Sequence, residues 1–168
     1  MKTIHELIRE LSSLGAVVTG HGPKHPEVPS DDLGAEIAAF LDEHGFLRRD
    51  EEYVDFLESY AGLLLTREHD FLSLSVYGFD PEIGLHLTEG EGDLLTEDGF
   101  LTFADATVSE QEGVFGPNDP LGVAFGFDAT GERRPGVYRN LSGRPYDWYC
   151  EGFTEWLETL VRLRGRWI

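Results

Sequence analysis

The sequence predicts an α+β fold with N-terminal helices, an antiparallel or mixed meandering sheet of about five or six strands, and a C-terminal amphipathic helix. Two patterns predict it. Apolar residues recur every three or four positions near both ends of the chain, whereas between them they alternate with polar residues or form short runs separated by turns. Because the helical and extended segments are grouped, a doubly wound parallel sheet is disfavoured.

Two helices are expected before residue 46. Thr3-Ile4-His5-Glu6 has the form of a capping box, and Gly15 is placed to close the first helix. The glycines and prolines of residues 20–29 exclude a helix there and predict an exposed loop. Ser30 is the expected cap of the second helix, which Gly45 ends.

A third helix is expected to begin after Asp50, whose carboxylate can accept hydrogen bonds from the first turn. Gly62 is suited to its exit, and the apolar residues that follow lead towards a strand. Spacings of three and four place the apolar residues of this helix on one face: Tyr53, Phe56, Leu57 and Tyr60.

The middle of the chain has the pattern of an antiparallel sheet. Residues 71–77 alternate apolar and polar side chains, which is typical of a strand with one buried face. Residues 136–140 are expected to pair back across the turn at 128–131. Further short apolar runs separated by turn residues lie at 83–87, 100–103 and 121–127.

The last element is expected to be a helix into which Trp148 and Tyr149 lead. Its buried face is formed by apolar residues at helical spacing, namely Phe153, Trp156, Leu157, Leu160 and Val161. Without repeats or a low-complexity linker, residues 1–168 are predicted to form one domain.

The amino-acid composition limits the cellular locations and the classes of partner that are expected for the protein. No stretch approaches the roughly 18 apolar residues of a membrane span, and one cysteine excludes an internal disulfide, so a cytoplasmic protein is expected. The net charge of −19 disfavours binding to nucleic acid or anionic membranes and favours a basic protein partner. Solubility alone is an alternative explanation of this acidity.

The sequence contains no pattern typical of a catalytic or metal site. His21 and His25 have the separation of two zinc ligands, but the intervening proline prevents the helix that would align them, so exposed loop histidines are expected. Cys150 has no histidine beside it in the sequence, and no phosphate-binding or nucleotide-binding motif occurs. The protein is therefore not expected to be an enzyme or to need a cofactor or metal.

Acidic residues in the predicted loops are the candidate partner-binding site. Phe100 and Phe115 lie near them and would supply apolar anchors. The alternative is that the acids are solvated turn residues and both phenylalanines belong to the core. The candidate set is Glu89, Glu91, Asp93, Glu97, Asp98, Glu110, Glu112, Asp119, Asp128 and Tyr138.

Several of these motifs together resemble the SUKH superfamily over residues 31–163. The acidic cap, the Tyr53-x-x-Phe56-Leu57 helix and the following apolar run resemble its signature helix-to-strand segment. The Asp128-x-x-Gly131 turn, the later Val137-Tyr138 pair and the C-terminal helix resemble the remainder of the domain. Residues 132–135 lengthen the usual short connection, and the first helix has no counterpart in the resemblance.

The resemblance implies an immunity protein that binds a cognate secreted toxin, often a nuclease, and blocks it by occlusion. The strong acidity suits capture of the basic surface with which a nuclease holds phosphates. The alternative hypothesis is a small-molecule-binding or enzymatic α+β domain with a pocket between sheet and helices.

Overall fold

The computed structural model of the chain describes residues 1–18, 22–67, 72–79, 95–109, 120–141 and 144–165. These residues form an α+β fold with a six-stranded antiparallel sheet, as the sequence predicts. The helical elements are α1 (Ile4–Ser13), α2 (Gly34–Glu43), η1 (Gly45–Arg49), α3 (Glu51–Ser59) and α5 (Phe153–Arg162). The strands are β1 (Leu63–Arg67), β2 (Leu72–Val76), β3 (Phe100–Ser109), β4 (Pro120–Asp128), β5 (Val137–Leu141) and β6 (Asp147–Cys150).

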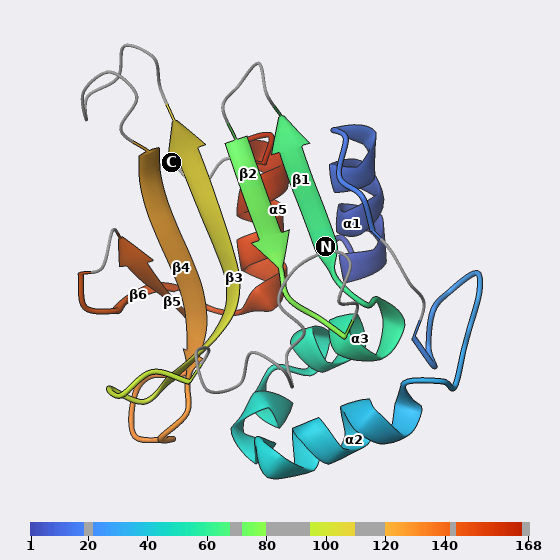
Figure 1. Cartoon of the computed structure of the whole chain (residues 1–168), viewed down its shortest axis with the longest axis horizontal. Helices are drawn as coiled ribbons and strands as arrows, with labels where there is room; N and C mark the ends of the chain where they lie inside the picture. The colour runs from blue at the N-terminus through green and yellow to red at the C-terminus, as the bar shows by residue number, and fades with distance from the viewer. Residues whose placement is uncertain (19–21, 68–71, 80–94, 110–119, 142–143, 166–168) are drawn as a thin grey trace.

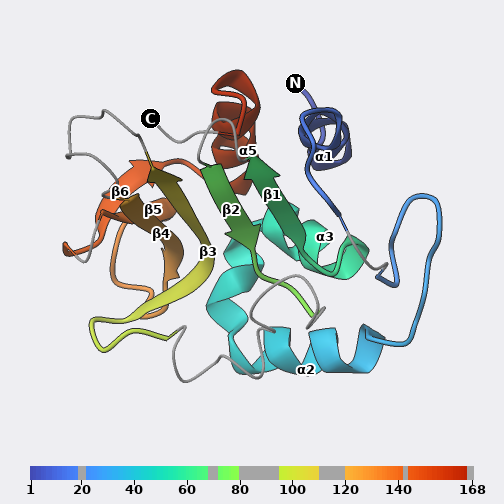
Figure 2. The same cartoon turned by 45° about the horizontal axis from the view of Figure 1, so that its top comes forward.

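The sheet is a meander in which each strand pairs with the next one along the chain, in the order β1-β2-β3-β4-β5-β6. Leu74, Ala106 and Val123 are aligned across β2, β3 and β4, and all three are buried. α1 and α5 lie side by side against one face of the sheet, and α2 and α3 lie near its lower end (Figure 1). The tilted view in Figure 2 shows the same arrangement.

Aromatic side chains fill the space between the sheet and the helices. The Trp156 ring centroid on α5 lies 5.0 Å from that of Phe103 and 5.2 Å from that of Phe125. Phe153 lies 5.2 Å from both Tyr53 and Phe56, so α5 and α3 meet over the sheet. Tilted and edge-to-face rings at these separations are favourable beyond the apolar area that they bury.

The start of α1 is as predicted, and the start of α2 is not. The Thr3 hydroxyl accepts from the Glu6 N–H while the Glu6 carboxylate accepts from the Thr3 N–H, which completes the capping box. α2 begins at Gly34 and not directly after Ser30, and its N-cap, Leu33, makes no side-chain hydrogen bond. The Ser30 N–H donates to the Gly22 carbonyl, so Ser30 closes the preceding loop in place of capping the helix.

α3 and the strands agree with the sequence prediction, except that α3 ends at Ser59 with an extended Tyr60 as its C-cap and not at Gly62, and that two further elements are present. Asp50 caps α3, and the four predicted apolar residues of this segment are buried. β5 pairs antiparallel with β4 across the 128–131 turn, as expected. Residues 147–150 form β6, although the sequence suggests only a lead into the last helix. The 3₁₀ helix η1 is also absent from the prediction, and its Leu47 is buried. The apolar run at 83–87 lies outside the described residues.

The described helices are short. α1, α2 and α5 have ten residues each and α3 has nine. A membrane-spanning helix needs about 20 mostly apolar residues. Within the described ranges, no helix reaches the length and apolar character that crossing a membrane requires.

Candidate functional site

The structure describes four of the predicted partner-binding residues. Glu97 and Asp98 are exposed in the turn before β3, whereas Asp128 and Tyr138 are buried, with 8% and 6% of their surface accessible. Arg133 connects two of them, because its guanidinium lies 2.9 Å from the Asp128 carboxylate and donates to the Asp98 carbonyl at 2.8 Å. Outside the described residues lie Glu89, Glu91, Asp93, Glu110, Glu112 and Asp119.

The hydrogen bonds of the Asp128 carboxylate stabilise the turn that follows β4. Its Oδ1 accepts from the Thr130 N–H at 3.0 Å and the Thr130 hydroxyl at 2.7 Å, and its Oδ2 accepts from the Arg133 N–H at 3.0 Å. Burial alone would raise the pKa of Asp128, but these hydrogen bonds and the Arg133 guanidinium lower it to about 2. Asp128 therefore stabilises the turn and offers little charge to a partner.

The polar 132–135 segment covers a group of aromatic side chains. The Arg133 guanidinium lies 4.2 Å from the centre of the Phe100 ring, and that of Arg134 lies 3.7 Å from the Trp148 ring. The Tyr138 hydroxyl donates to the Arg134 carbonyl at 2.9 Å. Phe100 is buried, as the alternative interpretation of this aromatic expects. Arg133 over Phe100 and Arg134 over Trp148 each make a favourable cation–π contact.

Five carboxylates surround an open depression where the N-terminal ends of α3 and α5 meet. Its volume is about 420 Å³, and Arg49 has the one basic side chain among the described residues that line it, which also include the N-terminal residue Met1. Glu151 pairs with Arg134, and Glu155 accepts from the Glu151 N–H. We call this the acidic depression, and its carboxylates are those of Asp50, Glu52, Glu151, Glu155 and Glu158.

Asp50, which lines the acidic depression, connects the starts of the two helices. Its Oδ1 accepts from the Tyr53 N–H at 3.0 Å in α3, and its Oδ2 accepts from the Phe153 N–H at 2.8 Å in α5. Burial raises the pKa of Asp50 above its ordinary value, although the two backbone hydrogen bonds act in the opposite direction. One carboxylate thus satisfies free N–H groups at two helix starts.

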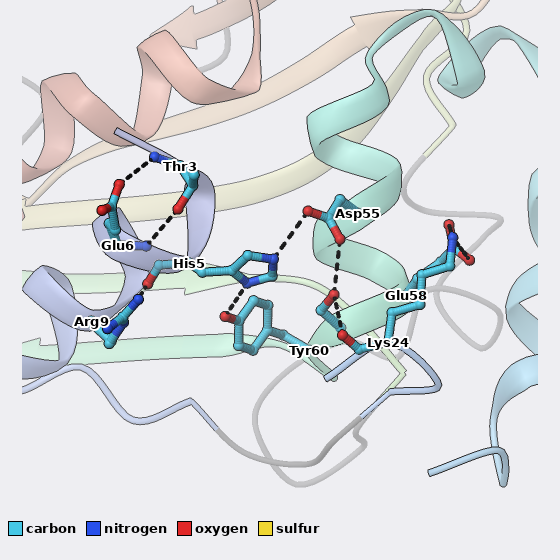
Figure 3. Close-up of polar contacts among 9 residues, drawn as sticks. Thr3, His5, Glu6, Arg9, Lys24, Asp55, Glu58 and Tyr60 are labelled. Carbon is cyan, nitrogen blue, oxygen red and sulfur yellow. Dashed lines mark hydrogen bonds and ion pairs between the residues drawn. The ribbon is translucent and has the colours of Figure 1, made fainter. Parts of the chain in front are cut away.

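A second polar network joins α1 to α3 on another part of the surface (Figure 3). His5 Nδ1 lies 2.6 Å from the Tyr60 hydroxyl, and His5 Nε2 lies 3.2 Å from Asp55 Oδ2. Burial and the Asp55 charge raise the pKa of Tyr60 to about 12, so its hydroxyl stays protonated and donates or accepts as His5 requires. Sequence inspection misses this network because 55 positions separate His5 from Tyr60.

The described residues offer no metal site. No group of three or more histidine, cysteine, aspartate or glutamate side chains among them is placed to hold a metal ion. Cys150 is buried at the end of β6, and burial raises the pKa of its thiol to about 12. A thiol with such a pKa is almost entirely protonated at neutral pH and is a poor nucleophile.

The fold and these sites define an acidic α+β protein in which short helices pack against one face and one end of an antiparallel meander. No protein-family model, curated protein or solved structure gives a significant match to the chain. Its resemblance to the SUKH superfamily therefore stays a prediction that rests on the sequence motifs alone.

Proposed function

We propose that this is an acidic binding protein that captures a basic protein partner, and that it acts as an immunity protein by occluding a cognate toxin domain. The observation that supports the proposal best is the acidic depression. Within the described residues, Glu52 and Glu158 line it and make no ion pair, in a chain whose net charge is −19. Lysine and arginine side chains of a partner would gain favourable charge contacts there.

Occlusion would result from where such a partner uses its positive charge. A nuclease domain holds the phosphates of its substrate with lysine and arginine side chains. A protein that pairs with the same side chains competes with the substrate and blocks its access. The net charge of −19 would accelerate the encounter, and contacts made after docking would set the dissociation rate.

The first experiment is to capture partners from the source organism on the immobilised protein and elute them with rising salt. A retained basic protein is then purified, and its affinity, association rate and catalytic activity are measured with and without this protein. The proposal expects an association rate that falls steeply with salt, and loss of the partner's activity in the complex. Tight binding that leaves that activity intact would contradict the immunity role.

Charge reversal locates the binding surface. The double variant Glu52→Lys, Glu158→Lys is expected to bind the partner about tenfold or more weakly at low salt, because two carboxylates of the acidic depression are replaced. The matched control Asp31→Lys, Asp32→Lys makes the same change in net charge at two exposed residues outside the depression. Equal weakening by both variants would show that only the overall charge matters.

A further inference from the structure

Residues 22–30 form a closed loop whose base is attached to the C-terminal end of α3. The Gly22 and Lys24 N–H groups donate to the carbonyls of Ser59 and Glu58 at 3.3 and 2.8 Å. The Ser30 N–H closes the loop onto the Gly22 carbonyl at 3.0 Å. These are backbone bonds, and Lys24 adds an ion pair with Glu58 (Figure 3). The His25 N–H also donates to the Gly22 carbonyl at 3.1 Å, but no histidine ring takes part in these bonds, so the base of the loop does not depend on histidine protonation.

The tip of the loop, residues 25–28, depends on the ring of His25. His25 Nδ1 accepts from the Glu27 N–H at 3.1 Å and from the Val28 N–H at 3.0 Å. A ring nitrogen accepts a hydrogen bond only while it carries a lone pair, so Nδ1 is unprotonated and the proton of the neutral ring is on Nε2. Protonation of Nδ1 would break both hydrogen bonds, because the new N–H of the ring would point at the N–H groups of Glu27 and Val28.

The Tyr60 ring contacts the rings of both His5 and His25, and protonation affects the hydrogen bonds of these two histidines differently. The His25 ring is edge-on to Tyr60, with centroids 5.4 Å apart. His5 contacts Tyr60 through Nδ1 and Asp55 through Nε2. A protonated His5 donates from both nitrogens, so its ion pair with Asp55 strengthens and the Tyr60 hydroxyl changes from donor to acceptor. Lowering the pH therefore preserves the contacts of His5 with Tyr60 and Asp55, whereas it breaks the hydrogen bonds that His25 Nδ1 accepts.

We propose that His25 is a proton-operated latch: protonation of Nδ1 releases the backbone of residues 27 and 28 from the His25 ring, while the base of the loop and the contact between α1 and α3 are retained. Residues 25–27 of the tip and Tyr60 line a depression of about 280 Å³, and release of the tip would change the shape of this depression. The described charged groups around His25 are Arg9 of α1 and Glu27 of the loop, which line the same depression, and the Lys24–Glu58 pair.

The latch is tested by NMR on the whole chain between pH 7.5 and pH 5, which spans the usual titration of histidines. At pH 7.5, the ¹⁵N shifts of the His25 ring are expected to show an unprotonated Nδ1. At pH 5, after correction for the intrinsic rate, the Glu27 and Val28 amides are expected to exchange about tenfold faster, as two lost hydrogen bonds imply. Amides of β4 and α5 should not change.

Two variants assign the effect to His25. In His25→Asn the side-chain oxygen accepts the same kind of backbone hydrogen bond without titrating, so the tip should exchange at one corrected rate at both pH values. His5→Asn removes the other histidine at Tyr60 and should leave the pH dependence of the tip in place. The latch is refuted by pH dependence that persists in His25→Asn, by a protonated Nδ1 at pH 7.5, or by loss of protection throughout the protein at pH 5.

Discussion

Replacing Asp50 by alanine removes hydrogen bonds from two helix starts at once. The loss of one N-cap costs about 1 kcal/mol, so losing the acceptor of both the Tyr53 and Phe153 N–H groups should lower the free energy of unfolding by about 2 kcal/mol. For a domain of this size, that loss corresponds to a decrease in Tm of roughly 6 °C. Asp50→Asn keeps one acceptor oxygen and should lose about half as much.

Urea unfolding followed by circular dichroism measures this loss, with an unchanged m-value as the sign that the unfolded state is unaffected. Asp42→Ala is the matched control, because Asp42 is exposed and forms only a surface ion pair with Arg48, so its removal should cost about 0.5 kcal/mol or less. If Asp50→Ala and Asp42→Ala had the same free energy of unfolding, the inference that Asp50 caps both α3 and α5 would be refuted.

The cost of Asp50→Ala should also depend on pH. Folding raises the pKa of Asp50, so the stability that its protonated form contributes is present below the unfolded pKa of 3.8 and is lost as pH rises through the folded value. The difference between wild type and Asp50→Ala is therefore expected to be larger at pH 4 than at pH 8. Urea titrations at the two pH values measure it, and an equal difference would contradict the raised pKa.

The remaining predictions concern a buried carboxylate and two glycines. Folding lowers the pKa of Asp128 from 3.8 to about 2, so its ionised form contributes about 2 kcal/mol to the free energy of unfolding. This contribution is present above pH 3.8 and is lost as the pH falls through 2. Asp128→Asn should remove it at pH 7, as measured by urea titration. Gly22→Ala would place a Cβ 2.2 Å from the Glu58 carbonyl oxygen and should lower Tm by several degrees, whereas Gly34→Ala, with no atom within 4 Å, should leave Tm unchanged or raise it. Equal Tm values for the two glycine variants would contradict the close approach at Gly22.

Local interactions explain why much of the fold could be predicted from the sequence. The Thr3–Glu6 capping box and the Asp50 cap of α3 each involve residues three positions apart. The alternation in β2 likewise reflects one buried face. The same local logic predicts a cap at Ser30, but the Ser30 N–H takes part in the closure of the 22–30 loop, which depends on where Gly22 lies. Contacts of this kind, between residues that are not at a fixed separation along the chain, produce no recognisable sequence pattern.

The candidate site was predictable only as a property of composition. The excess of acidic residues indicates a basic partner, but sequence does not distinguish Asp128, which is neutralised by Arg133, from carboxylates that remain exposed. Asp50 meets the Phe153 N–H across 103 positions, so the acidic depression has no sequence signature. The sequence also presents residues 132–135 as an added polar connection, whereas Arg133 and Arg134 cover aromatic rings.

The two hydrogen bonds of Asp50 become possible at different stages of synthesis. The bond to the Tyr53 N–H closes a single turn and can form as soon as α3 has left the ribosome. The bond to the Phe153 N–H must wait until nearly the whole chain has been made, because β1 to β6 lie between the two residues. Until then, the first helical segment is capped but α5 is absent, so the core that both helices cover stays open to solvent and to chaperones.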